Sequence, residues 1–318
     1  MKKLVSVIIP TYNRARYLKE AIDSVLRQTF QGFEIIVVDD SSTDDTKDVV
    51  SSYGRKVKYI LQENRERAAA RNRGARDSEG DYVAFLDSDD LWLPNHLEEC
   101  LKALRNVPDA GVFFSGSYII DENGAIVSKM GLSPFNGYVL DEIISKYSSG
   151  GCNASSCLIK KTAFEKAGYF NEDRVLSGSE DWEMWARISA QEKFISTGVY
   201  TAMVRFHKGK SSIDADRMAK SMTMALDLLY KNPLISPRIE RLRKQAYAGL
   251  FTTIGINYYA AGKMNAARGY LKKAVKSCPV SLFTNKYIIY TFLRSLLGHW
   301  LSLLLRRVKW TITGKLLR

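Results

Sequence analysis

Apolar runs rich in Val and Ile alternate with helical patterns from Leu4 to Leu86. Two parallel strands of one sheet need a crossover connection between them, usually an α-helix. Strand-type runs separated by helical patterns therefore predict βαβ units on a parallel sheet, in an α/β fold. The expected elements are, in order, strand 4–10, helix 14–27, strand 34–39, helix 44–52, strand 57–61, helix 67–76 and strand 82–86.

The remainder of the chain has a different pattern. Helical patterns dominate beyond Ile213, with Pro233 and Pro237 near the change. Residues 251–279 have the spacing of one tetratricopeptide repeat. A single copy cannot form a solenoid, so a helical hairpin packed on its surroundings is expected. We expect helix 95–105, strand 112–120, a turn at 121–124 and strands near 155–159 and 194–205 within an α/β domain over 1–212, then a helical region over 213–280 and a tail over 281–318.

Positive charge is concentrated towards the C-terminal end of the chain. Residues 232–318 contain 16 Lys or Arg and one acid, Glu240, which gives a net charge of +15. The whole chain carries +13, so residues 1–231 carry −2. A segment this basic is expected to meet an anionic partner, and nucleic acid and an acidic membrane surface are both candidates.

The last part of the basic segment is typical of a helix that lies in a membrane surface. Residues 287–305 are rich in Leu, Ile, Tyr and Trp, but Arg294 and His299 interrupt them. A central Arg costs at least about 2.5 kcal/mol in a spanning helix, so an in-plane amphipathic helix on anionic lipid is favoured. The alternative is a buried packing helix with a charged end. The aromatic residues lie in apolar helical patterns, so no nucleic-acid partner is expected.

Polar residues end the expected strands, at the edge where parallel sheets bind ligands. Thr11 follows the first strand, Asp39 ends the second, and residues 87–90, Asp-Ser-Asp-Asp, follow the fourth. Three carboxylates in one turn are the hard oxygen ligands that Mg²⁺ or Mn²⁺ takes together with substrate phosphates. The alternative is that one of the last two Asp residues caps a helix starting near Leu91. The sequence lacks Gly-x-Gly-x-x-Gly and Gly-x4-Gly-Lys-Ser/Thr, which argues against dinucleotide and P-loop binding.

Taken together, five segments resemble the family 2 glycosyltransferases, whose fold is called GT-A. They occur in order across residues 4–207, and their combination is more specific than any one of them. The resemblance implies a GT-A-type, Rossmann-like mixed sheet flanked by helices, followed by an α-helical C-terminal region. The matching segments are residues 6–14 (SVIIPTYNR), 36–44 (IVVDDSSTD), 70–74 (ARNRG), 86–90 (LDSDD) and 179–182 (SEDW).

For the donor, the resemblance implies a nucleotide-sugar pocket. Asp39 would accept hydrogen bonds from the base, Arg71 would point at the nucleotide, and the residues that follow the first strand would line the base and ribose. The residues alone leave open strand-end capping for Thr11 and Asp39 and a solvated basic helix face for Arg71. The nucleotide-sugar-binding residues expected are Pro10, Thr11, Tyr12, Arg14, Asp39, Arg71, Asp87 and Ser88.

The resemblance also implies a divalent cation, Mn²⁺ or Mg²⁺, at a DxD motif. Asp89 would bind the metal, Asp87 would lie near the ribose or the metal, and His207, after the last expected strand, is a further candidate ligand. Such a cation offsets charge on the departing nucleoside diphosphate. Asp181 is implied as the general base that takes the proton of the acceptor hydroxyl, with Glu180 positioning the acceptor or Asp181. The alternative for either acid is a cap of the amphipathic helix that follows.

The function expected is inverting, metal-dependent transfer of a sugar from a nucleotide-diphosphate sugar, with UDP favoured, to an acceptor hydroxyl. The family's processive members carry Gln-x-x-Arg-Trp after the base; its absence from the sequence predicts one addition per encounter. The basic tail favours a lipid-linked or surface-polysaccharide saccharide of the cell envelope as acceptor, such as a polyprenyl-diphosphate-linked one, and a peripheral, cytoplasmic-face membrane location. The alternatives are a nucleotidyltransferase, which should show a Gly-rich basic phosphate loop after the first strand, and a non-catalytic binding module using the helical basic tail.

Overall fold

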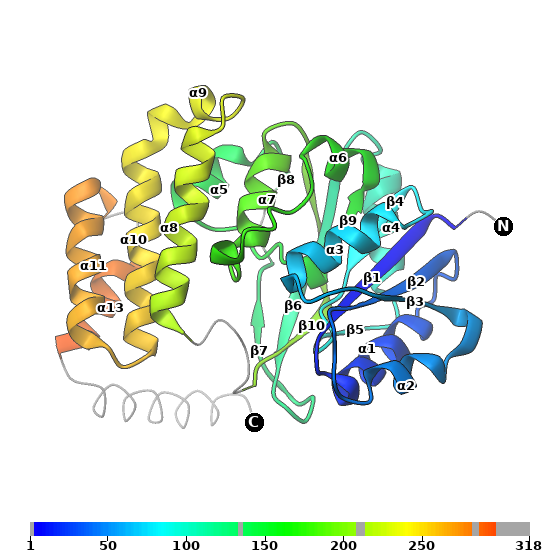
Figure 1. Ribbon diagram of the computed structural model, residues 1–318. Helices are drawn as coiled ribbons and strands as arrows, with labels where there is room; N and C mark the ends of the chain where they lie inside the picture. Colours follow the sequence, from blue (N-terminus) through cyan, green and yellow to red (C-terminus); the bar gives the residue numbers. More distant parts are fainter. Residues whose placement is uncertain (1–2, 133–135, 208–213, 282–285, 297–318) are drawn as a thin grey trace, which may run out of the picture. The chain divides into compact units, whose positions relative to one another are not determined.

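The computed structural model describes residues 3–132, 136–207, 214–281 and 286–296. Contacts within the chain divide it into two compact units, Met1–Ile143 with Ser148–Lys210 and Ile144–Tyr147 with Ser211–Arg318. The first unit contains the sheet, and the described part of the second is built from helices (Figure 1).

A 10-stranded mixed sheet forms the centre of the first unit. The strand order is β3-β2-β1-β4-β9-β6-β10-β5, with β7 paired to β6 and β8 paired to β10. The first four strands are parallel, β9 is antiparallel to both of its neighbours, and β10 is parallel to β6. The strands are β1 Val5–Thr11, β2 Phe33–Asp39, β3 Val57–Leu61, β4 Tyr82–Phe85, β5 Leu91–Trp92, β6 Val112–Ile120, β7 Ile126–Met130, β8 Asn136–Gly137, β9 Cys157–Lys160 and β10 Phe194–Arg205.

The parallel βαβ arrangement predicted for the first part of the chain is confirmed. All of β1 is buried, and β2 is buried except at one partly exposed residue, because helices cover both faces of this half of the sheet. The predicted strands 57–61, 112–120 and 194–205 have the same bounds as β3, β6 and β10. The antiparallel position of β9 makes the whole sheet mixed, also as predicted.

Helices cover the two faces of the sheet in the order that right-handed crossovers require. Since β2 and β3 lie on one side of β1 and β4 lies on the other, α1 and α2 cover one face and α3 covers the opposite face. One stripe of α1, including Leu18, Ile22 and Val25, is buried in the core with β1. The helices are α1 Ala15–Leu26, α2 Thr46–Ser51, α3 Glu66–Arg76, α4 His96–Asn106, α5 Leu140–Lys146, α6 Lys161–Lys166 and α7 Glu180–Ser189.

The helix α3 lies unusually close to the sheet because one of its residues, Gly74, has no side chain. A Cβ atom at position 74 would lie 2.4 Å from Cγ2 of Ile8 and 3.2 Å from Cγ2 of Val38. A larger residue there would require the side chain of Ile8 to move. The contact fixes the distance between α3 and the sheet, and with it the position of Arg71.

The turn after β4 does not lead into a helix at Leu91, so the alternative that Asp89 or Asp90 caps such a helix is wrong. Residues Leu91–Trp92 form β5, which pairs antiparallel with β10, and α4 begins only at His96. Sheet pairing wins because Trp92 is anchored: its indole N–H donates to the backbone oxygen of Ser155 at 2.6 Å. The predicted helix 95–105 corresponds to α4.

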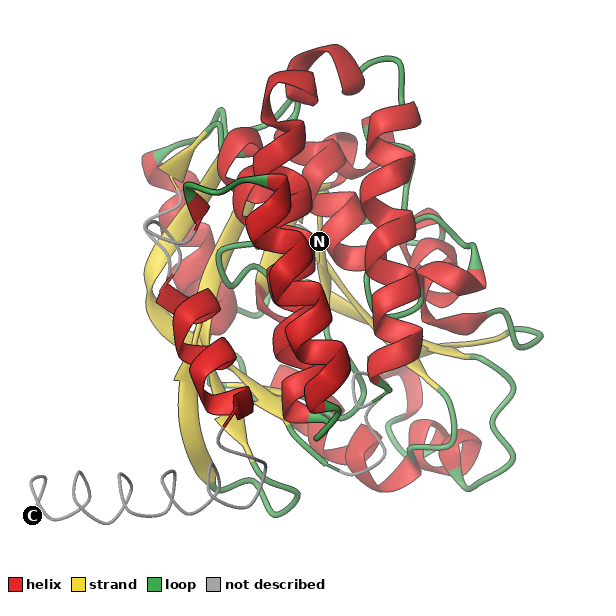
Figure 2. Ribbon diagram, turned by 90° about the vertical axis from the view of Figure 1, so that its left-hand side faces the viewer, coloured by secondary structure: helices red, strands yellow, loops and turns green. Residues whose placement is uncertain are grey.

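The helices α8, α10 and α11 of the second unit lie side by side (Figures 1 and 2). The predicted hairpin is formed by α10 and α11. The two helices are in close contact at Gly255, where an added Cβ atom would lie 3.0 Å from the side chain of Leu271. No helix in the described part of the chain is long and apolar enough to cross a membrane. Of the predicted in-plane helix over 287–305, residues 297–305 lie outside the described residues. The helices are α8 Ala215–Lys231, α9 Ser236–Ile239, α10 Arg243–Ala260, α11 Met264–Ser277 and α13 Lys286–Leu296.

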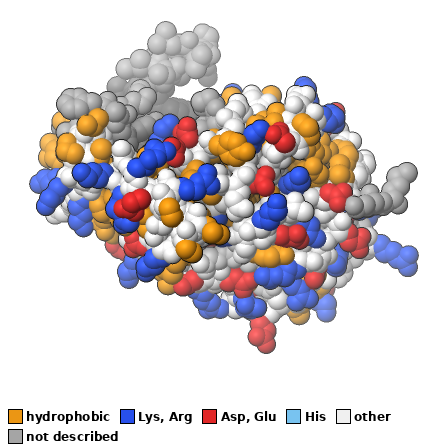
Figure 3. Space-filling view, turned by 90° about the horizontal axis from the view of Figure 1, so that it is seen from above, with side chains coloured by type: hydrophobic (Ala, Val, Ile, Leu, Met, Phe, Trp, Pro, Cys, Tyr) orange, Lys and Arg blue, Asp and Glu red, His pale blue; other side chains and the backbone are white. Residues whose placement is uncertain are grey.

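The charge separation found along the chain does not extend over every face of the molecule. On the face drawn in Figure 3, acidic and basic side chains are interspersed among polar and apolar ones. Mixed surfaces of this kind produce only a weak net field.

Candidate active site

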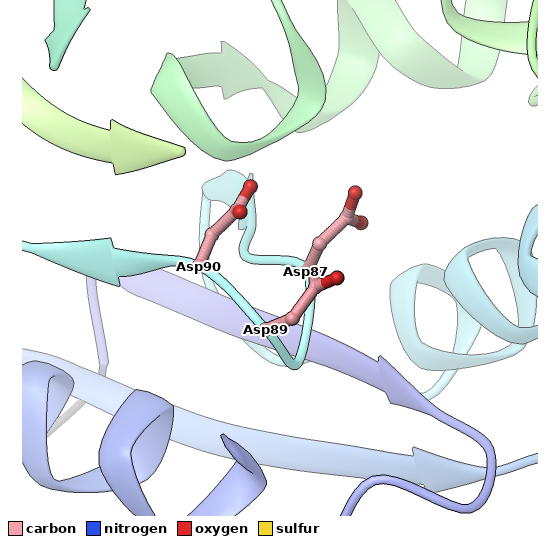
Figure 4. Close-up of side chains that lie close together, drawn as sticks. All are labelled: Asp87, Asp89 and Asp90. Atoms are coloured by element: carbon pink, nitrogen blue, oxygen red, sulfur yellow. The ribbon is translucent and has the colours of Figure 1, made fainter. Parts of the chain in front are cut away.

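The aspartates after β4 lie together in one tight turn. Asp87, Asp89 and Asp90 each offer a carboxylate oxygen, and these oxygens lie within 4.8 Å of one another. Figure 4 shows the three side chains on the turn, with the carboxylates of Asp87 and Asp90 pointing to the same side. Ser88, between them in the sequence, is buried. The turn closes by a hydrogen bond from the Asp90 N–H to the Asp87 backbone oxygen, at 2.9 Å.

Two residues that the sequence analysis did not single out hold this turn in place. The Ser155 hydroxyl donates to Asp90 Oδ2 at 2.7 Å and accepts the Asp87 N–H at 3.1 Å. The backbone N–H of Arg205 donates to Asp90 Oδ1 at 2.9 Å, and its side-chain Nε donates to the backbone oxygen of Asp89, also at 2.9 Å. Asp90 is thus a buried support for the turn rather than a helix cap.

His207 lies beside the aspartate turn. Its Nε2 is 2.7 Å from Oδ2 of Asp89, and its ring stacks on Tyr17 with the centroids 5.5 Å apart. The buried guanidinium of Arg205 also lies over the Tyr17 ring, 4.8 Å from its centroid. The sequence placed His207 after the last strand, and the fold brings it to Asp89.

Arg71 connects the aspartate turn to the start of α7. Its guanidinium is 2% exposed, and it donates to Asp87 Oδ1 at 2.5 Å and to Glu180 Oε1 at 3.0 Å. The same guanidinium lies 5.3 Å from the centroid of the Phe170 ring. Both carboxylates raise the pKa of Arg71 in spite of its burial. A solvated basic helix face, the alternative for Arg71, is therefore wrong.

The adjacent acids Glu180 and Asp181 have opposite electrostatic environments. Burial alone would favour the protonated form of Glu180, but Arg67 and Arg71 hold its pKa below the usual value. For Asp181, burial raises the pKa to about 6, and repulsion from Glu180 adds to the shift against the attraction of Arg71. Glu180 is thus an ionised anchor, whereas Asp181 can exchange a proton near neutral pH.

Both acids occupy the first turn of α7, where a carboxylate is favoured by the helix dipole. Asp181 Oδ1 accepts the N–H of its neighbour Trp182 at 2.7 Å, and Glu180 Oε2 accepts the Gly178 N–H at 2.6 Å. The capping alternative therefore describes part of what these groups do. It does not account for the pairing of Glu180 with two arginines.

The ends of β1 and β2 form the part of the site predicted to hold the nucleotide. Thr11 and Asp39 are register partners, and both are buried. The Thr11 hydroxyl has no hydrogen-bond partner among the described residues, which is costly for a buried polar atom unless a ligand binds it. Pro10 is buried in β1, Tyr12 is 49% exposed, and Arg14 is partly exposed immediately before α1.

Asp39 is held by its own loop and by the neighbouring strand. Its Oδ1 accepts the Ser42 N–H at 2.8 Å, and its Oδ2 accepts the Tyr59 hydroxyl at 2.7 Å. Strand-end capping, the alternative for Asp39, is thus part of its role. The next residue, Asp40, caps α3 by accepting the N–H groups of Arg65 and Glu66, both at 2.9 Å.

The residues that support the site could not be recognised from the local sequence pattern. Ser155 and Arg205 act through partners far away in the sequence, so only the folded chain brings them to the turn. Asp40 had no local signal for its role either, because it follows β2 and the Arg65 N–H that it accepts at the start of α3 is 25 residues away. Trp182 and Trp185, three residues apart on α7, are both buried.

The donor set of the aspartate turn fits a hard divalent cation. Mg²⁺ and Mn²⁺ prefer carboxylate oxygens and usually take one or two of them together with phosphate and water. Asp87 and Asp89 are the partly exposed members of the turn, whereas both oxygens of buried Asp90 accept protein hydrogen bonds. Asp87 and Asp89 are therefore the residues that would hold such an ion.

The mixed sheet with an aspartate turn after its fourth strand is the architecture of GT-A glycosyltransferases. The model of the family described as "Glycosyl transferase family 2" matches residues 6–168. This chain belongs to glycosyl transferase family 2.

Curated relatives and solved structures agree with this assignment. An uncharacterised glycosyltransferase of Rickettsia felis is 36% identical over 191 residues, which are 58% of this chain and 31% of the relative. TuaG of Bacillus subtilis, named for teichuronic acid biosynthesis, is 39% identical over 132 residues, 40% of this chain and 52% of TuaG. The chain thus spans under a third of the Rickettsia felis protein and about half of TuaG.

The likeness of solved structures extends over nearly the whole chain. Residues 1–349 of S. aureus TarS, crystallised with UDP-GlcNAc, superpose with a TM-score of 0.64 at 18% identity, covering 92% of this chain and 90% of that one. The mannosyltransferase PcManGT of Pyrobaculum calidifontis, solved with GDP-Man and Mn²⁺, gives a TM-score of 0.54 at 20% identity, covering 93% and 88%. At these identities the comparison shows the GT-A fold.

Proposed function

We propose that this chain transfers one sugar from a nucleotide-diphosphate sugar to an acceptor hydroxyl, with inversion and with the help of a divalent cation. The observation that carries the proposal is the arrangement around Arg71. Its guanidinium contacts Asp87 of the aspartate turn on one side and Glu180, next to Asp181, on the other. Arg71 thereby connects Asp87, which would hold the cation and with it the donor diphosphate, to the start of α7, where Asp181 would accept the proton.

The donor nucleotide would bind at the ends of β1 and β2. Asp39 would accept an N–H of the base, the exposed ring of Tyr12 would offer a stacking face, and the unpartnered Thr11 hydroxyl would bind the donor. Pro10, Arg14 and Ser88 would complete this side. A UDP-sugar is the donor we favour, because the TarS structure holds UDP-GlcNAc.

Asp87 and Asp89 would hold Mn²⁺ or Mg²⁺, with His207 contacting Asp89 and available as a further ligand. When bound, the cation would neutralise charge that develops on the diphosphate leaving group. Ser155 and Arg205 keep the turn in the geometry that this binding requires. PcManGT, of the same fold, was solved with Mn²⁺ and GDP-Man.

Asp181 is the base in this proposal. A carboxylate with a pKa of about 6 is largely ionised at neutral pH yet basic enough to accept the proton of an acceptor hydroxyl. The hydroxyl oxygen would attack the anomeric carbon from the side opposite the diphosphate, which inverts the configuration. Glu180, held by Arg67 and Arg71, would position Asp181 and keep its pKa raised.

The acceptor we propose is a lipid-linked or surface-polysaccharide saccharide of the cell envelope, such as a polyprenyl-diphosphate-linked one. TuaG is named for teichuronic acid biosynthesis, a related task. The net charge of +15 in residues 232–318 fits a peripheral position at the cytoplasmic face of an anionic membrane. We propose transfer of a single sugar per encounter, supported by the absence of Gln-x-x-Arg-Trp from the sequence.

The proposal is tested with a panel of UDP-, GDP- and dTDP-sugars in the presence of Mn²⁺, Mg²⁺ or a chelator. Wild type should bind or slowly hydrolyse one donor class only with metal, and Asp89→Asn should lose this. Asp173→Asn serves as a control, since Asp173 is an exposed acid that only caps a short turn. Folded protein that binds no donor with either metal would overturn the proposal.

A further inference from the structure

The last described helix, α13, buries two polar residues and leaves three of its apolar side chains exposed. Thr291 and Ser295 are buried beside Ile288, although both are polar. The larger apolar side chains on the opposite face are in solvent: Ile289 is 46%, Leu293 56% and Leu296 58% exposed. A helix that packs on a protein surface normally does the opposite, and an exposed apolar face of this kind marks an interaction site.

This face borders an apolar groove between α11 and α13. The groove measures about 370 Å³, and its floor and walls include Leu271, Val275, Phe292 and Leu293. The two helices are joined by a hydrogen bond of 2.9 Å from the Arg268 guanidinium to the Ser295 backbone oxygen. The helix α13 is therefore packed against α11, and its apolar side chains are exposed in spite of this packing.

Basic residues border the groove, and acids do not. Lys272 and Lys276 line its edge on α11, and both are exposed one helical turn apart. From Arg241 to the end of the sequence there is no Asp or Glu. The occupant of this surface must accept apolar side chains at its centre and positive charges at its rim.

We infer that the α11–α13 surface, defined as Ile289, Leu293, Leu296, Lys272 and Lys276, docks on an anionic lipid bilayer. Apolar side chains would enter the headgroup–acyl boundary while the lysines contact lipid phosphates. The inference rests on the proposed membrane contact and locates it on described helices, and it does not depend on the transferase chemistry.

Two other occupants fit the surface less well. A second copy of the chain, paired through the same face, would bring lysines against lysines with no acid nearby to compensate them. Nucleic acid would find Tyr290, 48% exposed, among aliphatic side chains, whereas base stacking requires several exposed aromatic rings among the basic residues. Only a lipid surface combines an apolar interior with a layer of negative charge.

The test is flotation of the full-length protein with phosphatidylcholine vesicles, with and without phosphatidylglycerol. Wild type should bind only the anionic vesicles. Leu293→Asp should weaken binding roughly tenfold or more. The pair Lys272→Glu with Lys276→Glu should weaken it roughly 25-fold or more, about fivefold for each lysine. Matched controls are Leu234→Asp, at a leucine 78% exposed outside this surface, and Lys244→Glu, at an exposed lysine on α10.

Thermal unfolding and donor binding, measured on every variant, separate this question from folding and from the proposed reaction. Absence of vesicle binding in folded wild type would overturn both the membrane contact and its location. Equal losses in test and control variants, or none in either, would show that charge in general or another segment binds the membrane, and would overturn the α11–α13 surface alone. Pull-down of a second copy in place of vesicles would equally reject it.

Discussion

At the scale of single residues, two neighbouring carboxylic acids of the site differ in pKa because their surroundings differ. Glu180 is buried against Arg67 and Arg71, so its charge is compensated and its pKa lies below the usual value. Asp181 is buried beside that negative charge, and its pKa rises to about 6. The same functional group is thus held in its ionised form at one position and is titratable at the next.

The raised pKa of Asp181 predicts the pH dependence of transfer. A base must be ionised to work, so kcat/KM should rise with pH through about 6 and level off above 7. Ionised Asp181 falls from about 90% at pH 7 to about 10% at pH 5. Asp181→Asn should lower the plateau by about 10²- to 10⁴-fold and remove this inflection, with donor affinity unchanged. An inflection near 6 that survives in Asp181→Asn would contradict the assignment of the base.

Ser155 offers a second prediction at this scale. Its hydroxyl contacts Asp87 and Asp90, so Ser155→Ala should loosen the aspartate turn. Loss of such a supporting contact typically costs about 10- to 100-fold in metal affinity. Titration of Mn²⁺ in the presence of UDP measures it. The adjacent Ser156→Ala is the control, because the Ser156 hydroxyl bonds to the backbone of Asn153 and to the sulfur of Cys157. Equal effects of the two changes would show that the loop, rather than the Ser155 hydroxyl, matters.

At the scale of elements, the site depends on contacts that α3, α7 and β10 make with one another and with the aspartate turn. The helix α3 approaches β1 through Gly74, which brings Arg71 over the end of β4. From there Arg71 reaches both the aspartate turn and the first residue of α7. β10 adds the third connection, since Arg205 at its end contacts Asp89 and Asp90.

Removing the Arg71 connection should destabilise the protein. Arg71→Met removes one of the two arginines that pair with the buried Glu180, and with it the partner of Asp87, which should reduce the free energy of unfolding by about 3 kcal/mol. Urea denaturation measures the change. Arg73→Met on the same helix breaks only an exposed pair with Asp77, 51% and 32% exposed, and should cost less than about 1 kcal/mol. Similar costs for both variants would mean that Arg71 does not anchor α7.

At the scale of the whole molecule, the chain divides into two compact units. The proposed donor and metal residues all belong to the first unit, and the α11–α13 surface belongs to the second. Binding of a nucleotide and binding of a membrane would therefore be carried by different units of one chain, as the uneven charge of the sequence already suggested.

Calorimetry should show this division directly. UDP with Mn²⁺ at about 100 times its Kd should stabilise the unit that binds it by about 2.7 kcal/mol and raise the Tm of that transition alone. Asp89→Asn should show no shift. A single transition that moves as a whole with ligand would contradict the independent domains that we propose.

The sequence by itself determined the elements and the motif positions. Apolar runs separated by helical patterns predicted β1 to β4, and β1 and β2 are almost continuously apolar because both of their faces are buried. Three of the five motifs lay at strand ends, and the other two lay in α3 and at the start of α7. The local sequence pattern did not determine which elements contact one another. Whether Leu91 begins a helix or a strand depended on β10, more than 100 residues away in the sequence.

Only the tertiary structure decided how the site residues act. The pairing of Arg71 with Asp87 and Glu180, and the support of the aspartate turn by Ser155 and Arg205, join residues from distant parts of the chain. The raised pKa of Asp181 likewise depends on burial and on neighbouring charges. Sequence spacing carries no record of such contacts, because they arise only when the elements pack against one another.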